Sequence, residues 1–91
     1  MSWNVKIHRK AEKTASELPR RVLENLFQLM QEIQLSGPVR GNWPNYGKLT
    51  GNRHHCQLKQ GKPTYVAVWT EEKETITVEI IYAGTHEKAP Y

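Results

Sequence analysis

The sequence predicts an α+β fold: an N-terminal strand, a two-helix hairpin and a three-stranded antiparallel meander, with both helices packed on one face of the sheet. Three observations predict this order. Apolar and polar residues alternate at the start of the chain, apolar residues then recur at helical spacing, and three strand-like segments joined by short turns follow. A chain of 91 residues has room for one modest core, so residues 1–91 are expected to form a single domain.

The first expected elements are a strand and a short helix. Trp3, Val5 and Ile7 alternate with polar residues, which is the period-two pattern of a half-buried strand. The next segment, residues 11–18, carries apolar residues at the spacing of one helical face. Pro19 ends this helix because proline lacks a backbone donor.

A second, longer helix is predicted to begin at Pro19, because proline is favoured in the first turn of a helix. Its apolar residues recur three and four positions apart and form a broad stripe. They are Val22, Leu23, Leu26, Phe27, Met30 and Ile33. The pair Gly37-Pro38 is a typical stop signal, so the helix is expected to end there.

Residues 36–52 contain four glycines and two prolines without a sustained period, so we expect a long loop. Arg40, Trp43 and Tyr46 lie in this loop, and a cation beside two aromatic faces suits stacking on unpaired bases. The favoured interpretation of Trp43 and Tyr46 is packing on the end of the core, because aromatic side chains are largely buried in most proteins.

Three strands are expected after the loop, at residues 53–60, 64–70 and 75–83. The turns between them, residues 61–63 and 71–74, are short enough to make antiparallel hairpins. The register of the middle strand stays open, because a change of one residue in the first turn exchanges the faces of its aromatic residues and its valines.

The first strand of the meander divides its side chains between the two faces of the sheet. The polar face carries Arg53, His55, Gln57 and Lys59. The opposite face carries His54, Cys56 and Leu58 and is expected to point toward the helices. We therefore expect the polar face to be open and available for function.

The chain carries thirteen lysines and arginines against nine aspartates and glutamates, for a net charge of +4. A polyanion or an acidic protein is therefore a suitable partner. No segment reads as a membrane span or a signal peptide, and the single Cys56 fits a reducing compartment, so a cytoplasmic location is expected. The sequence also lacks a phosphate-binding glycine loop and a polar DNA-recognition helix.

The segment Gly84–Tyr91 puts an imidazole and a phenol, His86 and Tyr91, just beyond the last strand. Cleavage of RNA without a metal needs a base for the 2′-hydroxyl, an acid for the leaving 5′-oxygen and positive charge near the phosphate. Histidine suits both proton steps because its pKa lies near neutrality, and lysine or arginine supplies the charge. The alternative interpretation is a frayed chain end.

Metal chemistry is disfavoured. His54, Cys56 and His86 are possible zinc ligands, but the paired ligand spacings typical of zinc sites are missing. Cys56 is expected to face the core, where a thiol is unreactive, and His54 is expected to pack there as a core histidine. No metal or other cofactor is therefore expected.

Five segments occur in a familiar order and spacing. They are Trp3–Ile7, Glu17-Leu18-Pro19, Lys48-Leu49-Thr50-Gly51, Tyr65-Val66-Ala67-Val68-Trp69 and the ending Gly84–Tyr91. On these segments, which extend over nearly the whole chain, it resembles the RelE/ParE superfamily of type II toxins, small basic proteins encoded with an antitoxin. Members of the RelE branch cleave messenger RNA, usually in the ribosomal A site, so the resemblance implies a ribonuclease.

Within this resemblance, Lys59 falls where RelE has an active lysine, whereas Gln57 falls where it has another. Val66 replaces an arginine, and His86 stands where RelE has a further arginine. Tyr91 lies close to its late tyrosine. The YafQ-like branch is a closer analogy, because it uses histidines and ends in a Gly-Thr-His or similar motif before a late aromatic residue.

The analogy implies that His55, His86, Tyr91 and Lys59 are catalytic. The two histidines exchange protons with the substrate, with their acid and base roles open and with His54 as the alternative to His55. Tyr91 orients the attacking hydroxyl or stacks on a base. The expected RNA-binding residues are Arg53, Gln57, Lys62, Arg40 and Lys88.

The implied partners are a cognate acidic antitoxin, in a toxin–antitoxin hetero-oligomer, and messenger RNA in the ribosomal A site. Two alternatives remain open. ParE-like members of the superfamily share the fold but poison DNA gyrase by binding, and a degenerate toxin only binds its antitoxin. His86 favours the nuclease, whereas Gln57 and Val66 favour the degenerate toxin.

Overall fold

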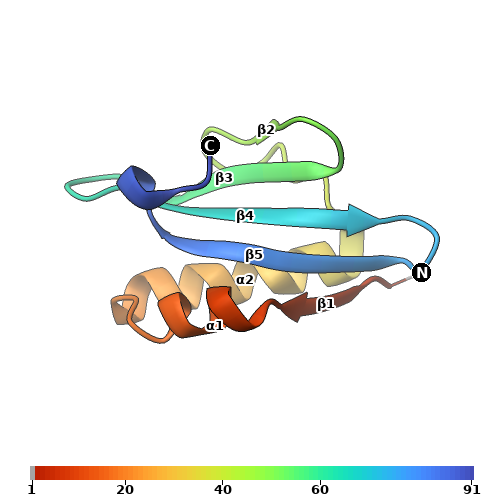
Figure 1. Ribbon diagram of the computed structural model, residues 1–91, viewed down its shortest axis with the longest axis horizontal. Helices are drawn as coiled ribbons and strands as arrows, with labels where there is room; N and C mark the ends of the chain where they lie inside the picture. Colours follow the sequence, from red (N-terminus) through yellow and green to blue (C-terminus); the bar gives the residue numbers. More distant parts are fainter. Residues whose placement is uncertain (1) are drawn as a thin grey trace.

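Five strands form one sheet, and two helices cover one of its faces (Figure 1). The computed structural model describes residues 2–91. The strands are β1 (Asn4–Ile7), β2 (Gly47–Lys48), β3 (Arg53–Lys59), β4 (Tyr65–Glu72) and β5 (Thr77–Thr85). Their order across the sheet is β1-β5-β4-β3-β2, in which β1 runs parallel to β5 and the other neighbours are antiparallel. The predicted α+β class and order of elements are confirmed.

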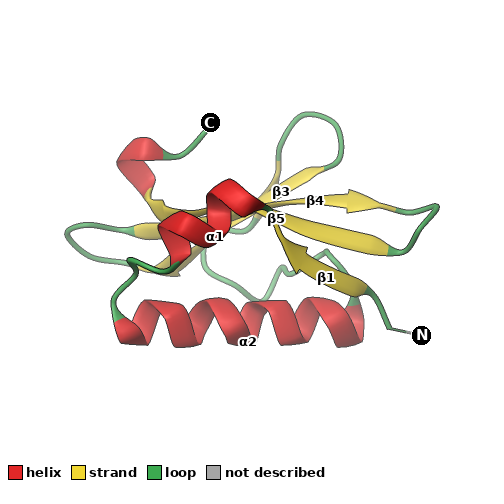
Figure 2. Cartoon of the chain, turned by 60° about the horizontal axis from the view of Figure 1, so that its bottom comes forward, coloured by secondary structure: helices red, strands yellow, loops and turns green. Residues whose placement is uncertain are grey.

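The two helices, α1 (Arg9–Ala15) and α2 (Arg20–Ser36), lie on the same side of the sheet (Figure 2). α1 ends at Ala15, before the end predicted at Pro19. Pro19 is instead the N-cap of α2, one position before the predicted first turn of that helix. The helix stops at Gly37 as expected, because the φ of 97° at this residue is a left-handed conformation that glycine adopts without strain.

The core fills the space between the helices and the sheet. On β3 the predicted buried set is confirmed, since His54, Cys56 and Leu58 are all buried, whereas Lys59 departs from the predicted polar face. On β4, Ala67 and Trp69 pack into this core. Val66 and Val68 therefore point to the other side of the sheet, which settles the register that the sequence left open. We refer to that other side as the outer face.

The strand ends differ from the expected ones. β4 continues through Glu72, so the turn expected at residues 71–74 moves to residues 73–76, where Ile76 has a positive φ of 50°. β5 accordingly begins and ends later than expected. The short strand β2 inside the long loop was not expected, because two residues are too few to show a period.

A buried hydrogen-bond network ties this loop to the sheet. His54 Nδ1 lies 2.7 Å from the Tyr46 hydroxyl, and His54 Nε2 lies 2.8 Å from Glu71 Oε1. The His54 ring also stacks on Trp69, with centroids 5.7 Å apart. The backbone N–H of Glu71 donates to the Asn52 carbonyl at 3.0 Å. Both ring nitrogens of His54 are therefore engaged, and the expectation of a core histidine is confirmed.

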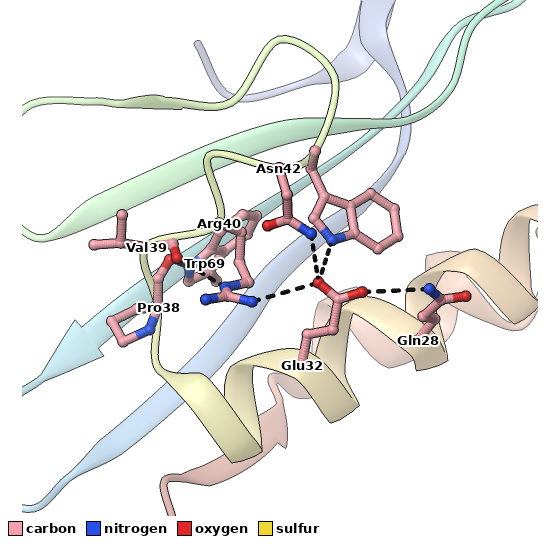
Figure 3. Close-up of polar contacts among 8 residues, drawn as sticks. Gln28, Glu32, Pro38, Val39, Arg40, Asn42 and Trp69 are labelled. Carbon is pink, nitrogen blue, oxygen red and sulfur yellow. Dashed lines mark hydrogen bonds and ion pairs between the residues drawn. The ribbon is translucent and has the colours of Figure 1, made fainter.

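A second network holds the start of the loop on α2 (Figure 3). The Glu32 carboxylate accepts hydrogen bonds from the Trp43 indole at 2.8 Å and the Asn42 amide at 2.9 Å, and it pairs with Arg40 at 3.4 Å. Burial alone would raise the pKa of Glu32, but the hydrogen bonds and the positive charge together hold it below its ordinary value. Trp43 and Tyr46 pack against the core, which confirms the favoured interpretation.

Replacement of His54 by alanine is expected to lower the free energy of unfolding by about 2–4 kcal/mol, because it opens a cavity and leaves the buried Glu71 carboxylate without its partner. Urea denaturation measures this loss. His86→Ala is the matched control, and its expected effect is within about 0.5 kcal/mol because His86 is exposed. Equal stabilities of the two variants would contradict the role given to His54.

Candidate active site

The C-terminal segment folds back over the outer face of the sheet (Figure 1). After β5, His86–Lys88 form a single 3₁₀ turn, η1, and the His86 N–H donates to the Thr64 carbonyl at 2.8 Å. The last residue, Tyr91, reaches His55 on β3. The chain end is therefore packed against the sheet rather than frayed.

Three of the sequence-predicted catalytic residues meet at this point: His55, His86 and Tyr91, here named the histidine–tyrosine cluster. The Tyr91 ring packs on His55, with centroids 4.8 Å apart and an angle of 37° between the ring planes. His86 meets the same phenol nearly edge-on, at 5.8 Å and 74°. The phenol thus contacts both imidazoles, although β3 and η1 are distant in sequence.

The cluster stands on a floor of valines. Val66 and Val68 lie opposite Gln57 and His55 of β3, and both are fully buried. The helices cover the other face of the sheet, so the side chains of the outer face and the returning tail bury these two residues. The outer face is therefore not the open polar surface that the sequence predicted, because its centre is apolar and covered.

This environment sets the protonation of the cluster. Burial lowers the pKa of His55 below its ordinary value, and the nearby His86 charge lowers it further. Burial also raises the pKa of Tyr91. At neutral pH, the site therefore holds a neutral imidazole at His55 and a protonated phenol at Tyr91.

One nitrogen of His55 has no protein partner. Its Nδ1 is buried, and no hydrogen-bond partner for it occurs within residues 2–91. Buried polar atoms are nearly always hydrogen-bonded in native proteins, so an unpaired one needs a particular explanation, of which catalysis is one. This nitrogen is thus not held by a hydrogen bond to any described residue, and the surrounding side chains cover it.

Gly47 makes room for the His55 ring. The two residues are paired across β2 and β3. A Cβ atom at position 47 would lie 2.8 Å from His55 Nε2, closer than real Cβ atoms approach other heavy atoms. Strand β2 therefore contributes to the site because Gly47 has no side chain. Any side chain at this position would displace the imidazole.

Two hollows flank the cluster, and each has a cation at its edge. One, of about 460 Å³, lies between Arg53 and Tyr91. The other, of about 400 Å³, is bordered by Lys62 and His86. Arg53 and Lys62, both predicted to bind RNA, thus each line a hollow beside the cluster, and the Glu87 carboxylate lines the second hollow together with Lys62.

Lys59 does not follow the alternation that predicted its place beside His55. The pairing register of β3 and β4 shifts between Gln57 and Lys59, so Lys59 pairs with Tyr65. The Tyr65 ring packs against the core on the helix side. Residue 58 acts as an extra residue in the strand, and the strict two-residue period ends before Lys59.

The remaining predicted RNA-binding residues lie outside the cluster. Gln57 accepts a hydrogen bond from the Gln60 amide at 2.8 Å, and Lys88 is exposed on η1. The Arg40 guanidinium is engaged on the helix side, where it pairs with Glu32 and donates to the Val39 carbonyl at 2.8 Å (Figure 3). The structure thus gives Arg40 a part in anchoring the loop.

Cys56 is buried, and burial raises its pKa to about 12, so the thiol is protonated and unreactive as expected. In the part of the chain that the structure describes, residues 2–91, no group of three His, Cys, Asp or Glu side chains is arranged to hold a metal ion. Neither helix in that part is both long and apolar enough to cross a membrane.

No protein-family model and no curated protein matches the sequence. Solved structures do match the fold. The isolated E. coli RelE toxin aligns with a TM-score of 0.74 and 21% identity, over 98% of this chain and 89% of that chain. The fold is that of the RelE toxins.

Two further structures have the RelE fold and similar length. In the archaeal RelE–RelB complex from Pyrococcus horikoshii OT3, the matching chain is 16% identical, with a TM-score of 0.71 and coverage of 98% of this chain and 100% of that one. The YoeB dimer from Staphylococcus aureus gives 14% identity and a TM-score of 0.71, over 94% and 99% of the two chains.

Sequence reasoning missed two residues of this RelE-fold site, Gly47 and Tyr82. In the sequence, Gly47 is one of four glycines in residues 36–52, and no pattern distinguishes it from the others. The hydroxyl of Tyr82 donates to the Thr85 carbonyl at 2.6 Å, next to His86. The motif before the tail marks Gly84 and His86, but nothing in the strand pattern shows that Tyr82 shares the outer face.

Gly47→Ala is expected to displace the His55 ring and disrupt its packing on Tyr91, because the new methyl group would occupy the space of His55 Nε2. The loss of the Tyr91 ring-current shift on the His55 ring protons measures the displacement by NMR. Gly41→Ala is the matched control, since a Cβ at position 41 meets nothing within 4 Å. Unchanged His55 shifts in Gly47→Ala would contradict this account.

His86→Gln is expected to raise the pKa of His55, because it removes a positive charge that disfavours protonation of that ring. The value should stay below 6.5, the ordinary value, since burial is the larger cause and remains. NMR titration of the His55 ring protons measures the change. His8→Gln, at the N-cap of α1, is the control, and an unchanged or lowered His55 pKa in His86→Gln would refute the coupling.

Proposed function

We propose that this chain is the toxin of a type II toxin–antitoxin pair and that it is a metal-independent endoribonuclease, which cleaves messenger RNA on the ribosome and so inhibits translation. The observation that carries the proposal is the histidine–tyrosine cluster. The fold brings two imidazoles to one phenol on a buried apolar floor, with Arg53 and Lys62 at its edges. These are the groups that RNA cleavage without a metal requires.

In the proposed reaction, His55 is the general base. Its lowered pKa keeps it neutral near pH 7, so it can take the proton of the RNA 2′-hydroxyl. The 2′-oxygen attacks the adjacent phosphorus, and the bond from phosphorus to the 5′-oxygen breaks. Protonated His86, the exposed imidazole at the rim, gives its proton to that leaving oxygen. The products are a 2′,3′-cyclic phosphate and a free 5′-hydroxyl.

Tyr91 and the nearby cations bind the substrate. The phenol remains protonated, because burial raises its pKa, and it donates a hydrogen bond or stacks on a base. Arg53 and Lys62 hold the phosphate and balance the charge that develops on it. Lys59, Gln57 and Lys88 are assigned to the more distant RNA backbone.

The proposed partner is an acidic antitoxin. The net charge of +4 favours such a partner. The structural neighbour from Pyrococcus horikoshii was solved as a complex of RelE with RelB. An antitoxin segment that folds on this surface would block access of RNA to the cluster and keep the toxin inactive until the antitoxin is removed.

Expression of the chain in a bacterial host without antitoxin, with mapping of messenger RNA 5′ ends by primer extension, tests the nuclease. His55→Gln and His86→Gln are each expected to lower the cleavage rate by roughly 10²–10⁴-fold, the contribution typical of a general base or acid. His8→Gln, which changes the histidine at the N-cap of α1, should cleave as the native chain does. Cleavage should also disappear from a reporter that lacks its start codon.

Three other outcomes of this experiment would change the proposed function. Cleavage of the untranslated reporter would mean that the enzyme acts without the ribosome. Growth arrest without any cleavage would refute the nuclease and make DNA gyrase the next target to examine. Normal growth with a folded protein would indicate a degenerate toxin that only binds its antitoxin.

A further inference from the structure

Tyr82 lies on the outer face because β5 contains an irregularity. The register between β4 and β5 shifts, so that Trp69 pairs with Ile80 while its neighbour Val68 pairs with Tyr82. Ile81 is the extra residue. Without it, Tyr82 would share the core face with Ile80; with it, Tyr82 joins Val68 on the outer face beneath the tail.

The Tyr82 ring lies along its own strand and over Gly84. A Cβ atom at position 84 would be 2.7 Å from the Tyr82 hydroxyl oxygen and 3.0 Å from Cζ. Gly84 has an ordinary backbone conformation, so it is required here for space rather than for a left-handed φ. The glycine of the Gly84-Thr85-His86 motif thus gives the phenol its position.

From this position, Tyr82 holds one side of the peptide group that joins Thr85 to His86. Its hydroxyl donates to the Thr85 carbonyl at 2.6 Å. On the other side of the same peptide, the His86 N–H donates to the Thr64 carbonyl at 2.8 Å. A peptide group is planar, so two opposed hydrogen bonds fix its orientation and with it the direction in which His86 leaves the sheet.

We propose that Tyr82 is a positioning residue that holds His86 in place for proton transfer. The role in catalysis rests on the proposed nuclease function, whereas the placement of His86 is a property of the folded chain alone. Tyr82 acts through the backbone of the residue before His86 and has no direct part in the reaction. Without the Tyr82 bond, the carbonyl side of this peptide loses its side-chain hydrogen bond, while the N–H side keeps its bond to Thr64.

The test removes only the hydroxyl. Tyr82→Phe keeps the ring over Gly84 and eliminates the bond to the Thr85 carbonyl. Tyr65→Phe is the matched control, because Tyr65 is the cross-strand partner of Thr85 but its ring packs against the core on the helix side. If the Tyr82 hydroxyl only stabilised the fold, Tyr82→Phe and Tyr65→Phe would have the same effect on His86.

The first measurement is the NMR titration of His55, which requires no enzymatic activity. The His86 charge lowers the pKa of His55, so a misplaced His86 lets that pKa rise. The expected result is a rise in Tyr82→Phe in the direction of His86→Gln, no change in Tyr65→Phe, and no additional rise when Tyr82→Phe and His86→Gln are combined. An unchanged His55 pKa in Tyr82→Phe, or an equal rise in both tyrosine variants, would overturn the proposal.

The second measurement is cleavage of RNA by the purified chain. Tyr82→Phe is expected to lower kcat by roughly tenfold with KM within about twofold, because misplaced catalytic groups slow the chemical step. Gly84→Ala, which pushes the phenol away, should lower kcat at least as much. A rise in KM with unchanged kcat would overturn the catalytic part. If the native chain cleaves no RNA, the nuclease proposal fails while the His55 titration still decides the placement of His86.

Discussion

The buried contact of His54 with Tyr46 and Glu71 is the constraint on which the site depends. Successive residues of a strand point to opposite faces, so a histidine fixed in the core forces its neighbour His55 onto the outer face. The same contact fastens the loop to β3 through Tyr46, and the next residue, Gly47, is the one that leaves room for the His55 ring. One hydrogen-bonded core histidine thus determines both the direction of the catalytic candidate and the space around it.

Irregularities in the two long hairpins complete the arrangement. The extra residue Ile81 turns Tyr82 and Gly84 to the outer face, next to the start of the tail. The extra residue at position 58 does the reverse and takes Lys59 out of the alternation with His55. Bulges redirect side chains near functional sites in many sheets. Here one bulge removes Lys59 from the face that carries His55, and the other brings Tyr82 to that face.

The sequence predicted what depends on simple periods and on the tail motif. Alternation separated His54 from His55, and the order of elements pointed to the fold and to a tail bearing His86 and Tyr91. It did not predict where alternation fails, because a bulge depends on backbone pairing between strands that no local pattern records. The ion pair of Arg40 could not be predicted for a similar reason. Its partner Glu32 lies on α2, and only the folded chain brings the two side chains together.

The apolar floor sets the protonation of a cluster that has few cations around it. By the family resemblance, Val66 stands in place of an arginine, and its buried side chain supplies low polarity instead of charge. Burial in these apolar surroundings lowers the pKa of His55, so this imidazole is neutral at neutral pH. Arg53 and Lys62 lie at the edges of the cluster. The unpaired Nδ1 of His55 costs about 1–3 kcal/mol of folding free energy. The rest of the core offsets this cost, so the fold keeps a buried imidazole nitrogen that no group within residues 2–91 pairs with.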